Sequence, residues 1–362
     1  MKILYITTIG DTMGFFQSIV KELLGAGNIV DLAANPNIGT LPGCFCAWGC
    51  RIYPLSCTRS PLDKNNLKAI REIRKIVSEG HYDIVHCHTP IAAMCTRIAC
   101  RKLRKNGLKV FYTAHGFHFY QGAPLKNWLL YYPVEWLCAH WTDVLITINR
   151  EDYARAKKHL HARRVEYVPG VGLDVSKFAD AVADRVAKRR EIRVPENAFL
   201  LLSVGELNGN KNHETVLRAL AKLGNENIHY AIAGEGELKK YLSDTAKSLG
   251  VEERLHLLGQ RSDVPELYKA ADAYVHPSFR EGLPVSVMEA MASGLPCILS
   301  RIRGSVDLAS EKDILCDPHS ADEFADAMKR FCHALPPKRD TEAVQTFSVD
   351  VVNRKMRHIY GL

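Results

Sequence analysis

The sequence predicts an α/β protein made of two doubly wound, Rossmann-like domains in series. Its 362 residues exceed the size at which one hydrophobic core usually stops growing, so two domains are expected. Short β-branched runs alternate with longer helical stretches, which is typical of a parallel sheet wrapped by helices. The alternation stops at the turn-rich stretch Val168–Gly172 and restarts at Phe199, so the pattern occurs twice.

The first predicted domain covers residues 1–168. Its strands are short β-branched runs bounded by polar or turn residues, namely Lys2–Ile9, Asp83–Thr89, Lys109–Ala114 and Asp143–Ile148. Its helices are longer stretches with apolar residues at helical spacing, among them Leu67–Glu79, Ala92–Lys105 and Lys126–His140.

The second predicted domain covers residues 169–347. Its strands are Phe199–Val204, His229–Ala233, Leu255–Leu258, Ala273–His276 and Pro296–Ser300, and its helices include Asn212–Lys222, Glu237–Leu249 and Val285–Ser293. The last helical stretch, within 348–362, could join either domain. Two such domains should direct the carboxyl ends of both sheets toward one cleft, with the turn-rich stretch as a hinge.

Composition favours a reduced, soluble chain. No run of eighteen uncharged apolar residues occurs and no signal-peptide pattern follows the first strand, so we expect a cytoplasmic protein. The eleven cysteines are scattered, which favours free thiols. Cys44, Cys46, Cys50 and Cys57 lack the paired spacing of zinc knuckles, and His86-Cys87-His88 is interpreted as a strand end rather than a ligand set.

Positive charge is concentrated in the first half. Residues 1–165 carry 22 Lys+Arg and 11 Asp+Glu, against 26 and 29 in the remainder. This asymmetry indicates an anionic partner for the first half, and a membrane surface, a phosphate-bearing acceptor or nucleic acid would each fit. A merely solvated basic face would give the same count.

The most informative stretch is Ser278–Ala290. It follows a predicted strand, turns at a glycine and enters a helix with Pro284 near its first position. Amide groups and the dipole at such a helix start favour a diphosphate. Glu281 precedes the helix and Glu289 lies about two turns in, so they would contact different parts of one extended ligand. The alternative is that Glu281 is solvated and Glu289 lies on an exposed face.

The stretch FREGLPVSVMEAMASGLP resembles the nucleotide-sugar signature of family 4 of the retaining glycosyltransferases, which have the GT-B fold. Two further stretches, YTAHGFHFYQGAPLKNWLLYYPVEWL and TDVLITINREDY, resemble the subgroup that serves bacterial exopolysaccharide and capsule assembly. The resemblance covers nearly the whole chain. It implies transfer of a sugar with retention from a nucleotide diphosphate, with uridine the expected base, to a saccharide that is expected to be lipid-linked.

The resemblance also implies roles for donor-binding residues. Glu281 would contact hydroxyls of the donor sugar, the backbone at Gly282 and Leu283 would help to hold it, and Glu289 would accept hydrogen bonds from the ribose. Lys211, in VGELNGNKNHE, matches the lysine that neutralises the diphosphate; its alternative is a solvated lysine at a helix start.

Further positions follow from the same resemblance. Arg261, in LLGQRSDV, lies in the segment that holds the base through its backbone. His115, in AHGFHF, matches the histidine beside the reacting sugar, although it could be a strand-end histidine with a structural role. His88 and His118 are assigned to the acceptor side. The family implies no metal, no other cofactor, no covalent glycosyl-enzyme and no nucleic-acid partner, while the basic first half permits peripheral contact with an anionic membrane.

Two departures from the family pattern leave donor contacts open. Many relatives have arginine after the glycine of the diphosphate strand, whereas Glu206 follows Gly205 here, so Arg280 or Arg303 is expected to supply the second positive charge. The loop after the first strand lacks an adjacent glycine pair. Gly14 is expected to let the backbone approach the phosphate or acceptor.

The sequence also bears on three other functions. A nucleotide-sugar 2-epimerase of similar architecture would convert the donor without an acceptor. A nicotinamide dehydrogenase is disfavoured because no G-x-G-x-x-G follows the first strand. A non-catalytic nucleotide-sugar or nucleic-acid binding module is disfavoured by the intact glutamate pair and Lys211.

Overall fold

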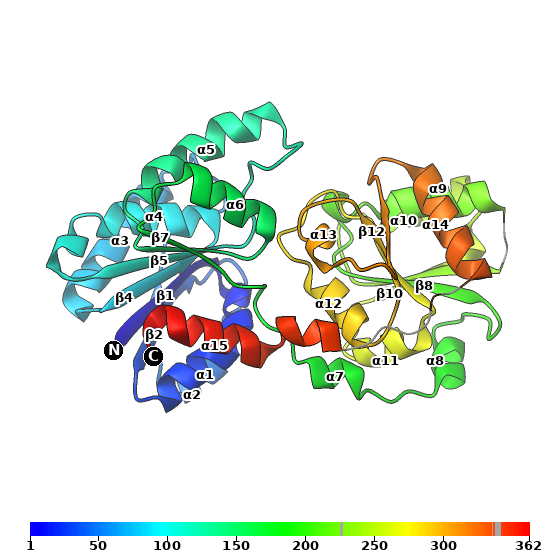
Figure 1. Ribbon diagram of the computed structural model, residues 1–362, viewed down its shortest axis with the longest axis horizontal. Coiled ribbons are helices and arrows are strands. Elements are labelled where there is room, and N and C mark those ends of the chain that lie inside the picture. Colours follow the sequence, from blue (N-terminus) through cyan, green and yellow to red (C-terminus); the bar gives the residue numbers. More distant parts are fainter. Residues whose placement is uncertain (225–226, 335, 337–341) are drawn as a thin grey trace. The chain divides into compact units, whose positions relative to one another are not determined.

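The computed structural model describes residues 1–224, 227–334, 336 and 342–362, and it confirms the predicted α/β class (Figure 1). The chain forms two compact units. Unit 1 comprises Met1–Gly172 together with Val349–Leu362, and unit 2 comprises Leu173–Ser348. The last helical stretch, which the sequence left open, therefore belongs to unit 1.

The residues of unit 1, all of which are described, form a seven-stranded parallel sheet in the order β3-β2-β1-β4-β5-β6-β7. The strands are β1 (Lys2–Ile9), β2 (Ile29–Asn35), β3 (Ile52–Pro54), β4 (Ile84–His88), β5 (Lys109–Ala114), β6 (Val144–Thr147) and β7 (Arg164–Tyr167). The order reverses between β1 and β4. Ligands bind at such a switch point, outside the carboxyl ends of the strands, in open α/β sheets.

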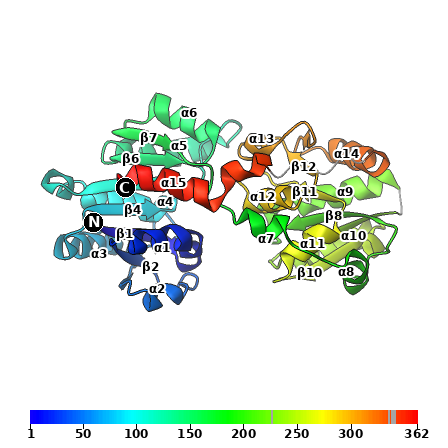
Figure 2. The same cartoon turned by 60° about the horizontal axis from the view of Figure 1, so that its bottom comes forward.

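Helices cover both faces of this sheet (Figures 1 and 2). They are α1 (Gln17–Gly25), α2 (Cys44–Ala47), α3 (Asn65–Gly80), α4 (Pro90–Cys100), α5 (Leu125–Ala139), α6 (Arg150–His159) and α15 (Val349–Tyr360), with the 3-10 helices η1 (Gly10–Phe16) and η2 (Leu103–Asn106). One apolar core lies between the sheet and α3, α4 and α6, and another lies between the sheet and α1 and α15. Burial of these two faces stabilises the unit.

The described residues of unit 2 form a six-stranded parallel sheet in the order β10-β9-β8-β11-β12-β13. The strands are β8 (Phe199–Val204), β9 (Ile228–Ala233), β10 (Leu255–Gly259), β11 (Ala273–His276), β12 (Cys297–Ser300) and β13 (Ile314–Cys316). The strand order reverses between β8 and β11. The loops after these two strands carry Lys211 and Glu281.

The helices of unit 2 are α7 (Val175–Ala179), α8 (Arg185–Glu191), α9 (His213–Leu223), α10 (Lys239–Ser248), α11 (Val264–Ala270), α12 (Val285–Ala292), α13 (Ser305–Leu308) and α14 (Ala321–His333). Short 3-10 helices add η3 (Gly209–Lys211), η4 (Glu252–Arg254) and η5 (Glu342–Phe347). The apolar faces of α9, α10 and α14 share one core with the central strands. The amphipathic spacing of these helices is what made them predictable.

The nine predicted strands are present, each within one residue at both ends. Strands β2, β3, β7 and β13 were not predicted. Strands β3 and β13 have only three residues, which is too short to be predicted from an apolar pattern. Strand β7 carries Arg164 and Glu166, so its apolar pattern is weak. The prediction of one helix over Ala92–Lys105 was wrong: α4 ends at Cys100, and the tighter η2 ends before Gly107, whose φ of 95° is left-handed.

A buried ion pair fastens α5 to α4. The Arg97 guanidinium donates to both carboxylate oxygens of Glu135, at 2.7 and 3.1 Å, and lies 4.3 Å from the centre of the Tyr112 ring on β5. Arg97 is completely buried, so this pair holds one face of α5 against unit 1, whereas Leu125 and Leu129 of the same helix are exposed. Among the described helices, none has the length and apolar character needed to cross a lipid bilayer.

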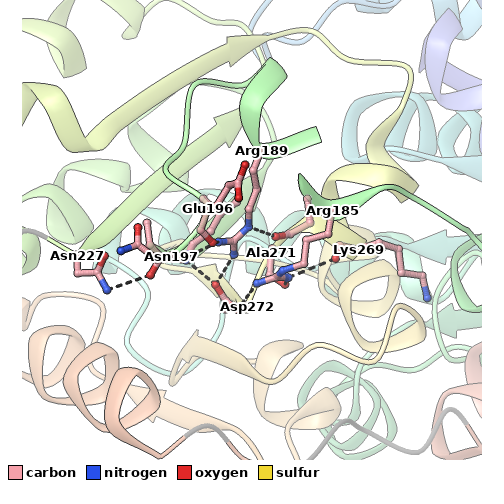
Figure 3. A network of polar contacts seen from close by, with 11 residues as sticks. Arg185, Arg189, Glu196, Asn197, Asn227, Lys269, Ala271 and Asp272 are labelled. Carbon is pink, nitrogen blue, oxygen red and sulfur yellow. Dashed lines mark hydrogen bonds and ion pairs between the residues drawn. The ribbon is translucent and has the colours of Figure 1, made fainter. Parts of the chain in front are cut away.

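A second polar network joins α8 to the amino ends of the unit 2 strands (Figure 3). The Arg189 guanidinium donates to the carbonyls of Ala270, Glu196 and Ala198 and, at 2.6 Å, to the carboxylate of Asp272. Asp272 also accepts from Arg185 and from the Leu200 amide. This network lies at the end of the sheet opposite to the loop that carries Glu281.

Candidate functional site

Two loops are fastened together at the switch point of unit 2. The η3 turn follows β8, and the segment 277–284 follows β11. The Asn210 carbonyl accepts from the Phe279 amide, and its side-chain amide donates to the Arg280 carbonyl, both at 2.9 Å. Asn212 donates to the Pro277 carbonyl at 2.9 Å. These contacts place the η3 turn directly against the stretch that the sequence singled out.

Lys211 and Glu281 form an ion pair there, with Lys211 Nζ 2.7 Å from Glu281 Oε1. The Nε2 atom of His276, the last residue of β11, lies 3.3 Å from the same oxygen. Burial would raise the pKa of the Glu281 carboxyl, but His276 and the Lys211 ammonium hold it well below its usual range. Burial also lowers the pKa of His276, so at neutral pH the Lys211 ammonium supplies the charge that pairs with an ionised Glu281.

Glycines allow the close approach of these loops. Gly205, at the end of β8, has a φ of 155°, and a Cβ atom there would lie 3.3 Å from Lys211 Cε. Gly304 has a φ of 79°, and its Cβ would lie 2.3 Å from the Gly282 carbonyl oxygen, a distance that real atoms do not reach. A side chain at either position would disturb the loop around Glu281.

Helix α12 begins after Pro284, which provides no side-chain cap for the amides of the first turn. Within the helix, Glu289 accepts a hydrogen bond of 3.0 Å from the buried Tyr268 hydroxyl. Burial raises the pKa of the Glu289 carboxyl, and this hydrogen bond offsets part of the effect. The interpretation of Glu281 and Glu289 as two exposed, solvated side chains does not hold, because both are largely buried. Leu283 is buried beside them.

The second positive charge has a candidate on the loop after β12. Arg303 is buried, and its Nε donates to the Glu281 carbonyl at 3.1 Å. Glu206, which stands where many relatives have arginine, is exposed and accepts from Asn208. Arg280 is half-buried and contributes its carbonyl to the loop contacts. Arg303 is therefore the cation that the fold places directly against the motif.

The Arg261 side chain is bound within unit 2. It donates to both carboxylate oxygens of Asp263, at 2.7 and 2.6 Å, and pairs with Glu191 on α8. Its guanidinium is therefore committed to neighbouring carboxylates. A role in binding the nucleotide base through the backbone stays a prediction.

In unit 1, His88 and His115, two of the predicted site residues, lie at the carboxyl ends of β4 and β5. His88 Nδ1 lies 3.1 Å from His115 Nε2, and the Phe16 ring stacks on His88 with ring centres 4.1 Å apart. His118 stacks on Tyr131 instead, with ring centres 4.4 Å apart. The structure thus brings His88 and His115 together and places His118 with the aromatic residues of α5.

His88 and His115 line a small pocket of about 30 Å³. Burial lowers the pKa of His115 to about 4 and holds the pKa of His88 well below its usual value. Both imidazoles are therefore neutral at neutral pH and act as hydrogen-bonding groups rather than as cations.

Gly14, in η1, is not the glycine that the fold requires. A Cβ atom there would lie 3.8 Å from its nearest neighbours, an ordinary contact, whereas one at Gly10 would lie 2.9 Å from the Leu41 amide nitrogen. The steric need for glycine is thus at Gly10. Whether Gly14 approaches a ligand stays a prediction.

Two groups of side chains were missed by the sequence analysis. His276 was predicted only as a strand residue, although its place directly before the glutamate motif was a usable signal. The other group joins residues far apart in sequence: the Tyr360 hydroxyl on α15 contacts the Tyr5 hydroxyl at 2.5 Å and His86 Nδ1 at 2.6 Å. No local pattern could have revealed that group.

The four cysteines considered for a metal site are free thiols: Cys44 and Cys46 lie in the short helix α2, and Cys50 and Cys57 are buried. His86, Cys87 and His88 end β4, as predicted. In the part of the chain that the structure describes, no three His, Cys, Asp or Glu side chains converge as metal ligands would.

Two family models together match most of the chain. The model described as glycosyltransferase family 4 matches residues 15–174, and the model described as glycosyl transferases group 1 matches residues 184–341. EpsD of Bacillus subtilis (strain 168), which is named as a glycosyltransferase, is 42% identical to this chain over 257 residues. These residues are 70% of this chain and 67% of EpsD.

Two further proteins are similar over longer stretches. The Escherichia coli UDP-Gal:alpha-D-GlcNAc-diphosphoundecaprenol alpha-1,3-galactosyltransferase is 31% identical over 287 residues, which are 76% of this chain and 73% of that enzyme. The crystal structure of Anabaena Alr3699/HepE in complex with UDP and glucose superposes with a TM-score of 0.82 at 19% identity, over 100% of this chain and 99% of that one.

Proposed function

This chain belongs to family 4 of the glycosyltransferases, which have the GT-B fold. From that premise we propose that it transfers a sugar from a uridine diphosphate sugar to a lipid-linked saccharide, with retention of the anomeric configuration. The observation that carries the proposal is the Lys211–Glu281 pair, which joins the η3 turn after β8 to the loop between β11 and α12. An ammonium, an ionised carboxylate and a helix start form one polar site there. A sugar diphosphate offers a partner to each of them.

The proposed step builds negative charge on the leaving diphosphate. The bond between the anomeric carbon and the diphosphate breaks, the acceptor hydroxyl forms the new bond from the same face, and its proton passes to a diphosphate oxygen. Lys211, Arg303 and the first-turn amides of α12 stabilise the developing charge. Because these groups supply the positive charge, the proposed step needs no metal ion.

The two carboxylates have separate roles in this proposal. Glu281 stays ionised and accepts hydrogen bonds from hydroxyls of the donor sugar, and its ion pair with Lys211 holds it in place rather than freeing it as a nucleophile. Glu289 accepts from the ribose. In unit 1, His115 lies beside the acceptor hydroxyl.

Relatives support the choice of substrates. The Escherichia coli relative is named for UDP-galactose and a diphosphoundecaprenol-linked acceptor, and the Anabaena structure contains UDP and glucose. We infer the same classes here, a uridine diphosphate sugar and a polyprenyl-diphosphate-linked saccharide, in surface polysaccharide assembly at the cytoplasmic side of the membrane.

The test is a transfer assay with labelled UDP-glucose, UDP-galactose and their N-acetylamino counterparts, each with saccharide-diphosphoundecaprenol acceptors, in the presence and absence of a chelator. We expect chelator-insensitive transfer with one donor, and a product linkage with the anomeric configuration of that donor. Conversion of a UDP-sugar without any acceptor would instead establish an epimerase. Failure of every UDP-sugar would contradict the proposed donor.

Contact with the membrane is proposed through the outer face of α5. Five large apolar side chains on this helix are between 41% and 72% exposed: Leu125, Leu129, Leu130, Trp136 and Leu137. Lys126 lies on the same exposed surface, within the half of the chain that carries the excess of positive charge. Apolar side chains flanked by cations are suited to the interface of an anionic bilayer.

Vesicle flotation tests this contact. Vesicles containing phosphatidylglycerol should bind the protein more strongly than phosphatidylcholine vesicles, and high salt should weaken the binding. Replacing Leu125 and Leu129 by serine should weaken binding at least about threefold because apolar area is lost from the interface. Leu62→Ser, a change at another exposed leucine of unit 1, is the control. Equal binding by both variants would contradict a role for α5.

A further inference from the structure

We propose that Tyr268 of α11 is a positioning residue for the donor nucleotide: it orients the Glu289 carboxylate toward the ribose, and the preference of the site for ribose over a deoxyribose depends on it. This inference rests on the proposed function, because it concerns the carboxylate that the proposed function assigns to the ribose. It goes beyond that assignment by naming the residue on which the ribose contact depends.

The first observation is a hydroxyl that holds the carboxylate from a neighbouring helix. The Tyr268 side chain is completely buried, and its hydroxyl donates to Glu289 Oε2 at 3.0 Å and to the Ser286 carbonyl at 2.9 Å. A phenol has one proton, so the two acceptors share it. Both acceptors belong to α12, and this hydroxyl therefore fixes the carboxylate relative to the backbone of its own helix.

Such a contact matters for a glutamate because its long side chain has several rotamers to lose when it binds a ligand. A partner that fixes the side chain beforehand removes part of that entropy cost from binding. The Tyr268 contact engages Oε2 of Glu289. In the proposed arrangement, Oε1 is the oxygen that meets the ribose hydroxyls.

The second observation is that the tyrosine is itself held by other elements of unit 2. Its ring centre lies 5.7 Å from that of Tyr274 on β11 and 6.0 Å from that of Phe178 on α7, and both of these side chains are buried. Lys269, the next residue of α11, donates to the Ala179 carbonyl at the end of α7, at 2.9 Å. The Tyr268 hydroxyl is therefore presented from a packed ring on an anchored helix, which suits a positioning role.

The third observation concerns the charge of the carboxylate. Burial raises the pKa of the Glu289 carboxyl, and both the Tyr268 hydroxyl and the Lys177 ammonium act against this rise. An ionised carboxylate accepts stronger hydrogen bonds from hydroxyls than a neutral carboxyl does. Tyr268 thus favours the charge state of Glu289 that ribose binding needs, as well as its orientation.

A buried tyrosine hydroxyl needs a partner whatever its function, and Tyr82 of unit 1 is the matched comparison. Tyr82 is also buried, and its hydroxyl donates to Asp31 Oδ2 at 2.6 Å. Asp31 lies near the start of β2, and Tyr82 precedes β4. This pair is thus at the amino ends of its strands, whereas ligands bind at the carboxyl ends in such sheets. Tyr82→Phe also deletes a bond to a carboxylate, but it should not affect nucleotide binding.

The experiment measures the Kd of UDP and of 2′,3′-dideoxy-UDP, which lacks both ribose hydroxyls, by isothermal titration calorimetry. The proteins are the wild type, Tyr268→Phe, Glu289→Ala, the double variant that combines these two changes, and the control Tyr82→Phe. Phenylalanine keeps the buried ring at position 268, so this variant is expected to fold, and circular dichroism checks each protein. A crystal structure of the wild type with UDP is a second measurement that needs no variant.

We expect the wild type to bind UDP at least about tenfold more tightly than dideoxy-UDP, the factor that one hydrogen bond to a charged group supplies. Tyr268→Phe should weaken UDP binding at least about threefold and leave dideoxy-UDP binding within about twofold of the wild type. A general loss of structure would weaken both alike. In the Glu289→Ala background, Tyr268→Phe should change the UDP affinity less than about twofold, because it acts through a contact that is already lost.

The outcomes separate this inference from the proposed function. A wild type that binds no UDP overturns the proposed donor and this inference with it. If the wild type binds UDP and dideoxy-UDP equally, the role of Tyr268 is overturned, while sugar transfer from a UDP-sugar still upholds the proposed function. An unchanged preference in Tyr268→Phe, or an equal loss of preference in Tyr82→Phe, overturns only the role of Tyr268.

The crystal structure decides even if Tyr268→Phe does not fold. A ribose hydroxyl on Glu289 while Tyr268 keeps its hydrogen bond to the same carboxylate supports the positioning role. A Glu289 side chain that turns away from Tyr268 in order to meet the ribose overturns it.

Discussion

At the scale of single residues, the ion pair between Lys211 and Glu281 is the centre of the proposed donor site. Its two members come from loops 70 residues apart in the sequence, and they meet because β8 and β11 are neighbours in the sheet. In the proposed mechanism this contact orients Lys211 and Glu281 toward the diphosphate and the sugar, which is the preorganisation that electrostatic catalysis requires.

Replacing Lys211 by alanine should lower kcat/KM at least about 100-fold, because the leaving diphosphate loses a preorganised positive charge. Glu281→Gln should also lower it strongly, since a neutral amide accepts weaker hydrogen bonds from sugar hydroxyls. Steady-state kinetics with the best UDP-sugar measures both effects. The control is Lys222→Ala on α9, which pairs with Asp322 away from the motif.

Circular dichroism should show an unchanged fold for these three variants. Normal turnover by Lys211→Ala or Glu281→Gln would remove that residue from the proposed mechanism. A loss of activity in Lys222→Ala as large as in Lys211→Ala would show that the effect is not specific to the site.

At the scale of elements, the α8 helix is attached to its sheet mainly by polar contacts. Arg189 is 2% exposed and satisfies three carbonyls and Asp272 at once, whereas Arg185, one helical turn earlier, is 41% exposed. Figure 3 shows both guanidinium groups meeting the same carboxylate. Asp272 therefore has an architectural role, because it joins α8 to the sheet.

Arg189→Met should destabilise unit 2 by roughly 3 kcal/mol, since removing one partner of a buried pair leaves the other charge and several carbonyls unsatisfied. Arg185→Met should cost less than about 1 kcal/mol because its exposed pair is screened by water. Urea denaturation followed by circular dichroism measures the difference between these matched variants. Equal destabilisation would show that burial does not determine the contribution of these arginines.

At the scale of the whole molecule, stability should depend on the buried imidazoles. Burial lowers the pKa of His86 to about 3 and that of His115 to about 4, and it holds that of His88 well below its usual value. The unfolded chain protonates histidine near pH 6.5, so between about pH 6.5 and 4 the unfolded state binds more protons than the folded state. The contribution of these groups is therefore complete above that range and is lost as the pH falls.

Between pH 6 and pH 5, each of these histidines should lower the free energy of unfolding by roughly 1 kcal/mol. Tryptophan fluorescence in urea reports on unit 1, because the four tryptophans of the chain lie there: Trp48, Trp128, Trp136 and Trp141. His115→Gln should reduce the pH dependence by about 1 kcal/mol, and His358→Gln, an exposed change on α15, should leave it unaltered. A pH dependence that His115→Gln does not change would contradict a neutral buried imidazole.

Local features of this protein were predictable from the sequence, whereas contacts between distant residues were not. Nine strands and the position of the donor motif were predictable because apolar periodicity and turn residues are local signals. The prediction that Glu281, Lys211 and His115 are site residues came from a family resemblance. By contrast, the support of Glu281 by His276 and Arg303 required knowing which loops share the carboxyl end of a sheet.

The sequence by itself therefore determined the α/β class, the repetition of the doubly wound pattern and the residue types available for binding a sugar diphosphate. Only the tertiary structure decided which of them are neighbours: that α15 belongs to unit 1, that Tyr360 contacts His86, and that Arg303 lies against Glu281. The physical reason is that secondary structure depends on side-chain pattern within about ten residues. Contacts such as that between Tyr5 and Tyr360, 355 residues apart, depend on how whole elements pack.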